Sequence, residues 1–162
     1  MTHYDRLLQA LSSCGVEFIL IGGMAGIAHG SARFTNDVDV IYRRSADNHA
    51  RMVKALVPFE PYLRGAPKGL PFRWDVETIQ RGLNFTLTTS IGDIDVLGEV
   101  TGGGSYDRLL AFSSPLPVFG VECRVLGLEK LIETKRAAGR PKDIEAIAEL
   151  EALKEERDRL GR

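Results

Sequence analysis

Two aspartates alternate with valines in the segment DVDV at residues 37–40. Successive side chains of a β-strand point to opposite faces, so Asp37 and Asp39 share one face while Val38 and Val40 share the other. The Cα atoms of Asp37 and Asp39 are expected about 7 Å apart, which lets both carboxylates reach one or two divalent cations. Mg²⁺ takes hard oxygen ligands and keeps open positions for substrate phosphates, so the pattern indicates a magnesium site.

A later segment, GDIDVL at residues 92–97, repeats this arrangement with Asp93 and Asp95. If this strand lies beside the first, one of its aspartates would complete a three-carboxylate site. Asp95 is the better third ligand because apolar residues flank it on both sides, whereas Asp93 follows Gly92 and is also explained as a turn residue. Two metal ions held about 3.5 to 4 Å apart would bind phosphates, stabilise a leaving oxygen and lower the pKa of an attacking hydroxyl.

The carboxylates also have an interpretation without a metal. One aspartate pair on a strand is a weak signal, because exposed carboxylates need no cation. Two such strands in one short chain favour the metal interpretation, since burying unpaired charges is costly. If both carboxylate-bearing faces are exposed to solvent, no charge is buried and this reason to expect a metal no longer applies.

A strand that ends in two glycines, ILIGG, precedes the first aspartate pair. Gly22 and Gly23 would let backbone N–H groups approach phosphate oxygens at the start of a helix. Close packing of the strand on the helix explains these glycines equally well. In the following loop, HGSARFTND, Ser31 and Thr35 are predicted to donate to a phosphate and Arg33 to neutralise one.

Basic residues gather near the C-terminus of a chain with ordinary total charge: Lys130, Lys135, Arg136, Arg140 and Lys142. A triphosphate needs such groups, and Lys135 is the preferred contact. Arg136 is explained equally well as a cation near a helix C-terminus, where it complements the helix dipole. His29 is expected to be a packed, hydrogen-bonded histidine at a helix end rather than a catalytic base.

Helices and strands are expected to alternate around these motifs. The expected strands are residues 16–21, 37–41, 83–89, 93–97 and 121–126, with a hairpin joining the third and fourth. The expected helices are one around residues 7–11 and others at 24–30, 46–56, 75–82, 106–112, 128–138 and 143–160. Residues 58–71, rich in Pro and Gly, are expected to be irregular. This order predicts an α/β (α+β) fold, with a mixed β-sheet flanked by helices and followed by C-terminal helices.

Composition places few restrictions on function. The 162 residues suffice for one domain, which we expect to span residues 1–162, with a core at about 15–127 and a C-terminal helical region at about 128–160. A net charge of −1 gives no general attraction to nucleic acid or membrane. Cys14 and Cys123 are expected to be reduced thiols. The N-terminus does not resemble a signal peptide and no apolar run approaches the roughly 20 residues of a membrane span, so a cytoplasmic protein is predicted.

Taken in order, these segments resemble the small members of the DNA polymerase β-like nucleotidyltransferase superfamily. Those proteins carry a strand ending in Gly-Gly or Gly-Ser, a short helix, an Asp-x-Asp strand and a later strand with a third carboxylate. The matching segments here are ILIGG, DVDV and DIDVL. HGSARFTNDVD is similar to the Arg-x-Thr-x-Asp-x-Asp segment of many stand-alone bacterial and archaeal members, and LEKLIETKRAAGRPKD resembles a stretch that follows their catalytic sheet.

The resemblance implies magnesium-dependent transfer of a nucleoside monophosphate from an NTP, such as ATP, to a hydroxyl group, with release of pyrophosphate. It implies that Asp37 and Asp39 hold both metals and that Asp95 binds the metal that activates the acceptor hydroxyl. Gly22 and Gly23 would approach the triphosphate.

One departure from the polymerases concerns the glycine turn. The compact Gly-Ser-x-x-x-Gly form is missing, and Gly23 and Asp37 are fourteen positions apart. That spacing is closer to the lincosamide-modifying and phage-abortive branches. Whether Ser31 takes the place of the missing serine stays open.

Three functions remain open on sequence alone. The first is a nucleotidyltransferase acting on a small hydroxylated molecule, such as an aminoglycoside or a lincosamide. The second is a toxin–antitoxin component that modifies a protein hydroxyl or RNA, with a helical partner protein. The third is an inactive relative that binds a nucleotide or a partner.

The nature of the acceptor is only weakly indicated. A polynucleotide is less favoured, because the net charge is −1 and no aromatic residue follows Phe119. A small acceptor needs a pocket that Phe72, Trp74 and Phe85 could line, although we expect these three residues in the core.

Overall fold

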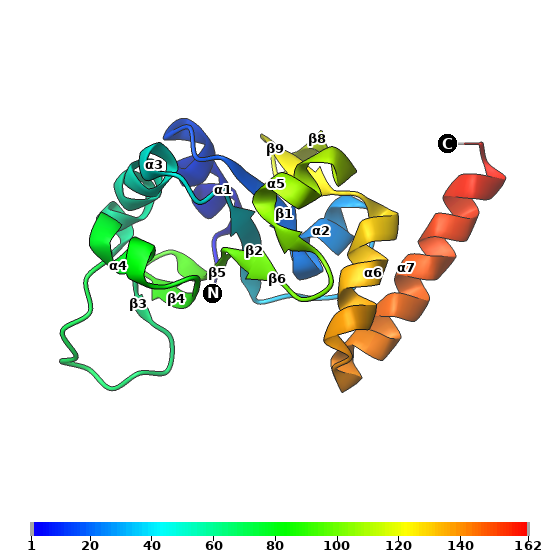
Figure 1. Ribbon diagram of the computed structural model, residues 1–162. Helices are drawn as coiled ribbons and strands as arrows, with labels where there is room; N and C mark the ends of the chain where they lie inside the picture. The colour runs from blue at the N-terminus through cyan, green and yellow to red at the C-terminus, as the bar shows by residue number, and fades with distance from the viewer. Residues whose placement is uncertain (1, 162) are drawn as a thin grey trace.

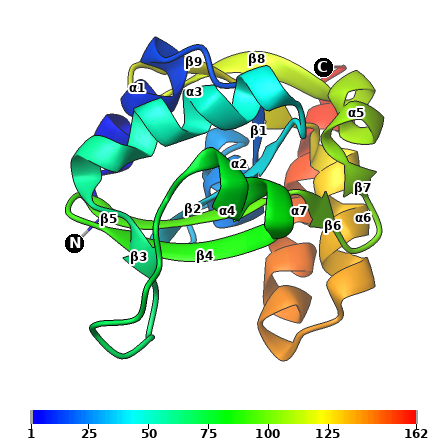
Figure 2. The same cartoon turned by 60° about the vertical axis from the view of Figure 1, so that its left-hand side comes forward.

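The computed structural model describes residues 2–161 and shows a mixed sheet with helices on both faces (Figures 1 and 2). The sheet has the order β3-β4-β5-β2-β1-β9-β8. Its strands are β1 (Phe18–Ile21), β2 (Asp37–Tyr42), β3 (Tyr62–Leu63), β4 (Asn84–Thr89), β5 (Gly92–Leu97), β8 (Ser113–Val118) and β9 (Val121–Leu126). A separate two-stranded sheet consists of β6 (Glu99–Val100) and β7 (Gly104–Ser105).

The helices lie close to the expected positions. They are α1 (Tyr4–Ser13), α2 (Gly22–Ala28), α3 (Ala46–Leu56), α4 (Val76–Arg81), α5 (Tyr106–Leu109), α6 (Leu128–Ala138) and α7 (Pro141–Arg159). Short 3₁₀ segments follow α3 at Val57–Phe59 and α5 at Leu110–Phe112. The predicted fold class, a mixed sheet flanked by helices with two helices at the C-terminus, is confirmed.

Local sequence explains where several helices begin and end. Ser45 caps α3 by accepting a hydrogen bond from the Asn48 amide at 3.2 Å. Gly139 adopts φ +64° at the end of α6, and Pro141 is the first residue of α7. The α6–α7 pair therefore turns sharply, and both helices lie at one side of the sheet (Figure 1).

The two faces of the central strand β2 have different neighbours. Val38 and Val40 are fully buried on the face covered by α1 and α3. Helix α1 contributes Leu7, Leu8 and Leu11 to this core, all with no exposed surface. Helices α2 and α6, which contact each other, lie on the opposite face with the aspartates. The apolar residues thus leave one face of β2 for polar groups.

Four strands, two of them in the main sheet, were not expected from the sequence. Strand β8 contains Pro115 and Pro117, but it is an edge strand that pairs only with β9, where a missing N–H is tolerated. Strand β3 is only two residues long and forms the other edge. The other two are β6 and β7, which pair with each other across a short glycine-rich turn at residues 101–103. Ser105 occupies the N-cap position of α5 without a side-chain hydrogen bond to the helix.

The aromatic residues considered for an acceptor pocket are in or against the core, as expected. Trp74 and Phe85 are buried and pack edge to face with ring centroids 5.4 Å apart. The Trp74 indole donates to the Met52 carbonyl oxygen at 3.1 Å. Cys14 and Cys123 are free thiols, as predicted. Among residues 2–161, we find no helix with the length and apolar character needed to cross a bilayer.

Candidate active site

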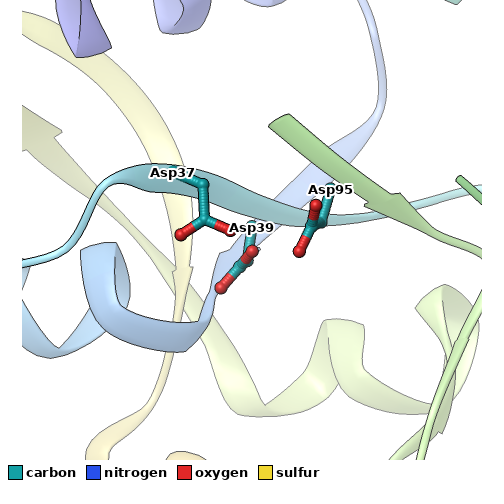
Figure 3. Close-up of side chains that lie close together, drawn as sticks. All are labelled: Asp37, Asp39 and Asp95. Carbon is teal, nitrogen blue, oxygen red and sulfur yellow. The ribbon is translucent and has the colours of Figure 1, made fainter. Parts of the chain in front are cut away.

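Sheet register brings the aspartates of β2 and β5 side by side. The two strands are parallel, Asp37 pairing with Asp93 and Asp39 with Asp95. Carboxylate oxygens of Asp37, Asp39 and Asp95 lie within 4.8 Å of one another, and Figure 3 shows the three side chains projecting to the same side. Three oxygens at this spacing can converge on a cation. Asp93 lies on the same face but outside this group.

The two glycines after β1 are explained by the space that Asp39 and Thr35 take. A Cβ on Gly22 would lie 2.1 Å from Asp39 Oδ2, and Gly22 also has φ +65°. A Cβ on Gly23 would lie 2.9 Å from the Thr35 Cβ. Close packing thus accounts for the Gly-Gly turn, and it seats Asp39 directly against the first turn of α2.

Burial makes the charged form of Asp39 unfavourable. It raises the pKa of Asp39 from 3.8 to about 8, and the charges of Asp37 and Asp95 add to this effect. Burial also raises the pKa of Asp95, while Asp39 and the Arg64 guanidinium act against the rise. Within the described residues, Asp39 Oδ1 is a buried oxygen with no hydrogen-bond donor. A bound cation would satisfy it.

Arg64 is a residue of this site that sequence reasoning missed. Its guanidinium lies 2.9 Å from Asp95 Oδ1, 3.4 Å from Asp93 Oδ2 and 3.6 Å from Asp37 Oδ2. It follows β3, inside the segment that was expected to be irregular, and only the pairing of β3 with β4 carries it toward the aspartates. No motif in the sequence points to it.

All nine site residues predicted from the sequence line one cavity of about 190 Å³. They are Gly22, Gly23, Ser31, Arg33, Thr35, Asp37, Asp39, Asp95 and Lys135. Phe34 also lines this cavity, with 83% of its surface exposed. Residues from separate segments of the chain are therefore brought together by the fold around this cavity.

Two of the proposed phosphate contacts are held by α7. The Ser31 hydroxyl donates to Glu149 Oε1. Arg33 Nη1 lies 3.4 Å from Glu145 Oε2, with the two side chains 41% and 80% exposed. Such an exposed ion pair is weak, so Arg33 can exchange Glu145 for a phosphate. Ser31 is more firmly engaged, because Glu149 also accepts from the Ala32 amide at 3.2 Å.

The basic cluster predicted near the C-terminus divides into two groups. Lys135, Arg140 and Lys142 line the cavity with the aspartates. Lys130 pairs with Glu133 at 3.0 Å, and Arg136 pairs with Glu151, so neither is directed to the cavity. Burial lowers the pKa of Lys135, which makes its ammonium group a poorly solvated cation that gains from an anionic ligand.

His29 is packed as predicted. Its Nε2 lies 2.8 Å from the Leu126 carbonyl oxygen, and its Nδ1 lies 3.2 Å from Arg157 Nη2. Both ring nitrogens therefore have structural partners. Burial lowers the pKa of His29, which favours the neutral ring that this arrangement requires.

A second cavity, of about 420 Å³, meets the first at the aspartates. Both are lined by Gly22, Asp39, Asp95, Lys135 and Arg140. The remaining wall of the second cavity is largely apolar and comes from the sheet and α6, with polar groups at its edge: Ile21, Asn84, Leu97, Glu99, Val100, Thr101, Leu126, Leu131, Thr134 and Ala138. The carboxylates thus stand where a basic cavity and a more apolar cavity join.

Comparisons with known proteins agree with this arrangement at the level of fold. No family model and no curated protein matches the sequence. A Thermotoga maritima protein, named only provisionally as a nucleotidyltransferase, gives a TM-score of 0.57 at 12% identity, over 92% of this chain and 94% of that chain. An antigenic nucleotidyltransferase-like protein from Paracoccidioides brasiliensis gives a TM-score of 0.55 at 18% identity, over 94% of this chain and 78% of that chain.

These likenesses define the class of fold. The chain has the fold of the small stand-alone nucleotidyltransferases, which is what the sequence resemblance predicted. At such low identities the likeness concerns the backbone arrangement alone.

Proposed function

We propose that this protein is a magnesium-dependent nucleotidyltransferase, which transfers a nucleoside monophosphate from an NTP to a hydroxyl group and releases pyrophosphate. The observation that carries the proposal is the convergence of Asp37, Asp39 and Asp95 in one cavity, with Asp39 and Asp95 also lining the second. Asp39 Oδ1 is buried without a hydrogen-bond donor among the described residues. A structural role for the three carboxylates would leave this cost uncompensated.

The donor set fits Mg²⁺. All three candidate ligands are carboxylates, which are hard oxygen donors, and the group contains no His or Cys that would favour zinc. Asp37, Asp39 and Asp95 would hold the ion. When bound, it would supply positive charge for the triphosphate and lower the pKa of the acceptor hydroxyl.

The first cavity is the better place for the triphosphate. Arg33, Lys135, Arg140 and Lys142 bring positive charge to it. Arg140 lies 2.9 Å from the buried Asp143, which fixes the guanidinium at the cavity wall. These cations would bind the β- and γ-phosphates and stabilise pyrophosphate as it leaves.

The second cavity is the better place for the acceptor. Its apolar wall suits a small molecule with a hydrocarbon face, and Asn84 and Glu99 at its edge suit hydroxyl or amino groups. In the proposed reaction the acceptor oxygen forms a bond to the α-phosphorus while the bond from that phosphorus to the bridging oxygen of the β-phosphate breaks. Asp95, which lines both cavities, would take the hydroxyl proton.

The test is incubation with Mg²⁺ and each α-³²P-labelled NTP, with label followed into small hydroxylated compounds, protein and RNA. Label in a small compound supports the proposal in full, whereas label in protein or RNA would favour the toxin–antitoxin alternative. The Asp37→Asn, Asp39→Asn and Asp95→Asn variants should each lose activity by about 100-fold or more. Asp47→Asn, which changes an exposed aspartate of α3, is the matched control and should keep full activity. NTP binding without transfer to any acceptor would favour the inactive relative and contradict the proposal.

A further inference from the structure

Arg64 reaches the aspartates from a fixed position on the edge of the sheet. Its backbone N–H donates to the Thr86 carbonyl oxygen at 3.0 Å, which continues the pairing of β3 with β4. Thr86 in turn pairs with Asp95, and Asp95 pairs with Asp39. Because directly paired residues point to the same face of a sheet, this row places Arg64 on the aspartate side.

The guanidinium itself is tethered. Arg64 Nη2 donates to the Leu87 carbonyl oxygen at 2.7 Å, and Nε lies 3.4 Å from Asp93 Oδ2. The loop that follows Arg64 is also fixed in place. The Tyr62 hydroxyl donates to the Pro67 carbonyl oxygen, and the Tyr62 ring packs edge to face on Phe72. The cation is therefore a built part of the site and not a side chain that happens to lie nearby.

The contacts of Arg64 with Asp95 and Asp37 are electrostatic. Asp95 Oδ1 lies 2.9 Å from Nη2, whose two hydrogens allow it to serve both this oxygen and the Leu87 carbonyl oxygen. The Asp95 oxygen is thus oriented by the guanidinium, and a carboxylate oxygen has a second lone pair for a ligand. A guanidinium can do this because its planar fork reaches several oxygens at once, which a lysine ammonium cannot.

We propose, on the basis of the metal-dependent function above, that Arg64 is a positioning residue that orients Asp95 and Asp37 and lowers the affinity of the site for its divalent cation. In this arrangement Asp93 is not a metal ligand. Asp93 acts through Arg64. Its ion pair with the guanidinium weakens the attraction of that guanidinium for Asp95 and Asp37. The two aspartates of β5 thus have different roles: Asp95 binds the metal, and Asp93 binds Arg64.

The test measures Mn²⁺ binding to the full chain by electron paramagnetic resonance of the free ion, alongside nucleotide transfer. Arg64→Gln removes a positive charge next to two ligands, so Mn²⁺ should bind about tenfold more tightly. Transfer should nevertheless fall, because Asp95 loses its orientation. Arg73→Gln is the matched control, an exposed arginine of the same connection, and should change neither quantity. Circular dichroism establishes that each variant is folded.

Asp93 is tested in two backgrounds. Asp93→Asn should weaken Mn²⁺ binding more in the wild type than in Arg64→Gln, because only the wild type contains the guanidinium that is then released onto Asp95 and Asp37. An equal or larger effect in the Arg64→Gln background would mean that Asp93 acts directly on the metal, which overturns the proposal. If Arg64→Gln does not fold, Arg64→Lys replaces it. That variant keeps the positive charge but loses the planar fork, so its Mn²⁺ affinity should stay close to that of the wild type while transfer falls; unchanged transfer would overturn the positioning role.

The outcomes separate this proposal from the proposed function. A wild type that binds Mn²⁺, with unchanged affinity in Arg64→Gln, overturns the role of Arg64 and leaves the metal site standing. A lower melting temperature with unchanged Mn²⁺ affinity would also overturn it, since that result indicates a purely structural arginine. A wild type that binds no Mn²⁺ overturns both.

Discussion

Replacing Asp39 by asparagine should stabilise the metal-free protein, and the gain should grow with pH. Burial raises the pKa of Asp39 from 3.8 to about 8, so the folded protein keeps this proton between pH 5 and pH 8. In the unfolded chain the same carboxyl is ionised over most of that range. The folded state therefore binds more protons, and the free energy of unfolding of the wild type falls as pH rises through this window.

The size of the fall in unfolding free energy follows from the difference between the pKa of Asp39 in the folded and unfolded states. One pH unit corresponds to about 1.4 kcal/mol for one proton, so the three units from pH 5 to pH 8 set an upper limit of about 4 kcal/mol. An asparagine side chain does not titrate, so the Asp39→Asn variant should lack this part of the slope. For a chain of this size, each kcal/mol changes the melting temperature by roughly 2–4 °C, which makes the predicted gain readily measurable.

The assay is thermal and urea unfolding of both proteins at several pH values between 5 and 8, first in EDTA and then in Mg²⁺. Mg²⁺ should stabilise the wild type at pH 8, by about 2.7 kcal/mol at 100 times its dissociation constant, and should have little effect on Asp39→Asn. Asp47→Asn, which alters an exposed aspartate, should follow the wild type throughout. Equal pH slopes for the wild type and Asp39→Asn in EDTA would refute the reasoning from burial.

Two further substitutions test how the site is built. Gly22→Ala should cost at least about 2 kcal/mol of stability in urea unfolding and abolish Mn²⁺ binding, because its Cβ would lie 2.1 Å from Asp39 Oδ2. Gly65 has a similar φ, +78°, and a Cβ there would meet no atom of the described residues within 4 Å beyond its chain neighbours. Gly65→Ala should therefore show only the backbone strain of about 1 kcal/mol and keep Mn²⁺ binding. Equal losses in both variants would contradict the role of Asp39. Lys135→Met should weaken NTP binding by about tenfold in equilibrium dialysis, since its cation lines both cavities. Lys130→Met, which loses the pair with Glu133 and a contact with the Phe112 ring outside both cavities, should not. Similar affinities for the two variants would exclude Lys135 as a phosphate contact.

Some features of the site follow from local sequence alone. The alternation in DVDV and GDIDVL requires each aspartate pair to share a face wherever these segments form strands. The apolar residues between them require that the other face be buried. The glycines of ILIGG mark a turn that permits close approach. These are properties of periodicity and residue size, so the carboxylates and the glycine turn could be found before the fold was known.

Other features depend on which strands become neighbours, which local sequence does not contain. The parallel pairing of β2 with β5 brings Asp95 to Asp39, although 56 positions separate them in the chain. The return of α6 and α7 places Lys135 at the cavity and turns Lys130 and Arg136 away from it. The pairing of β3 with β4 delivers Arg64, which no motif marks. Sequence periodicity thus determined which carboxylates could act together, and only long-range strand pairing decided which cations would meet them.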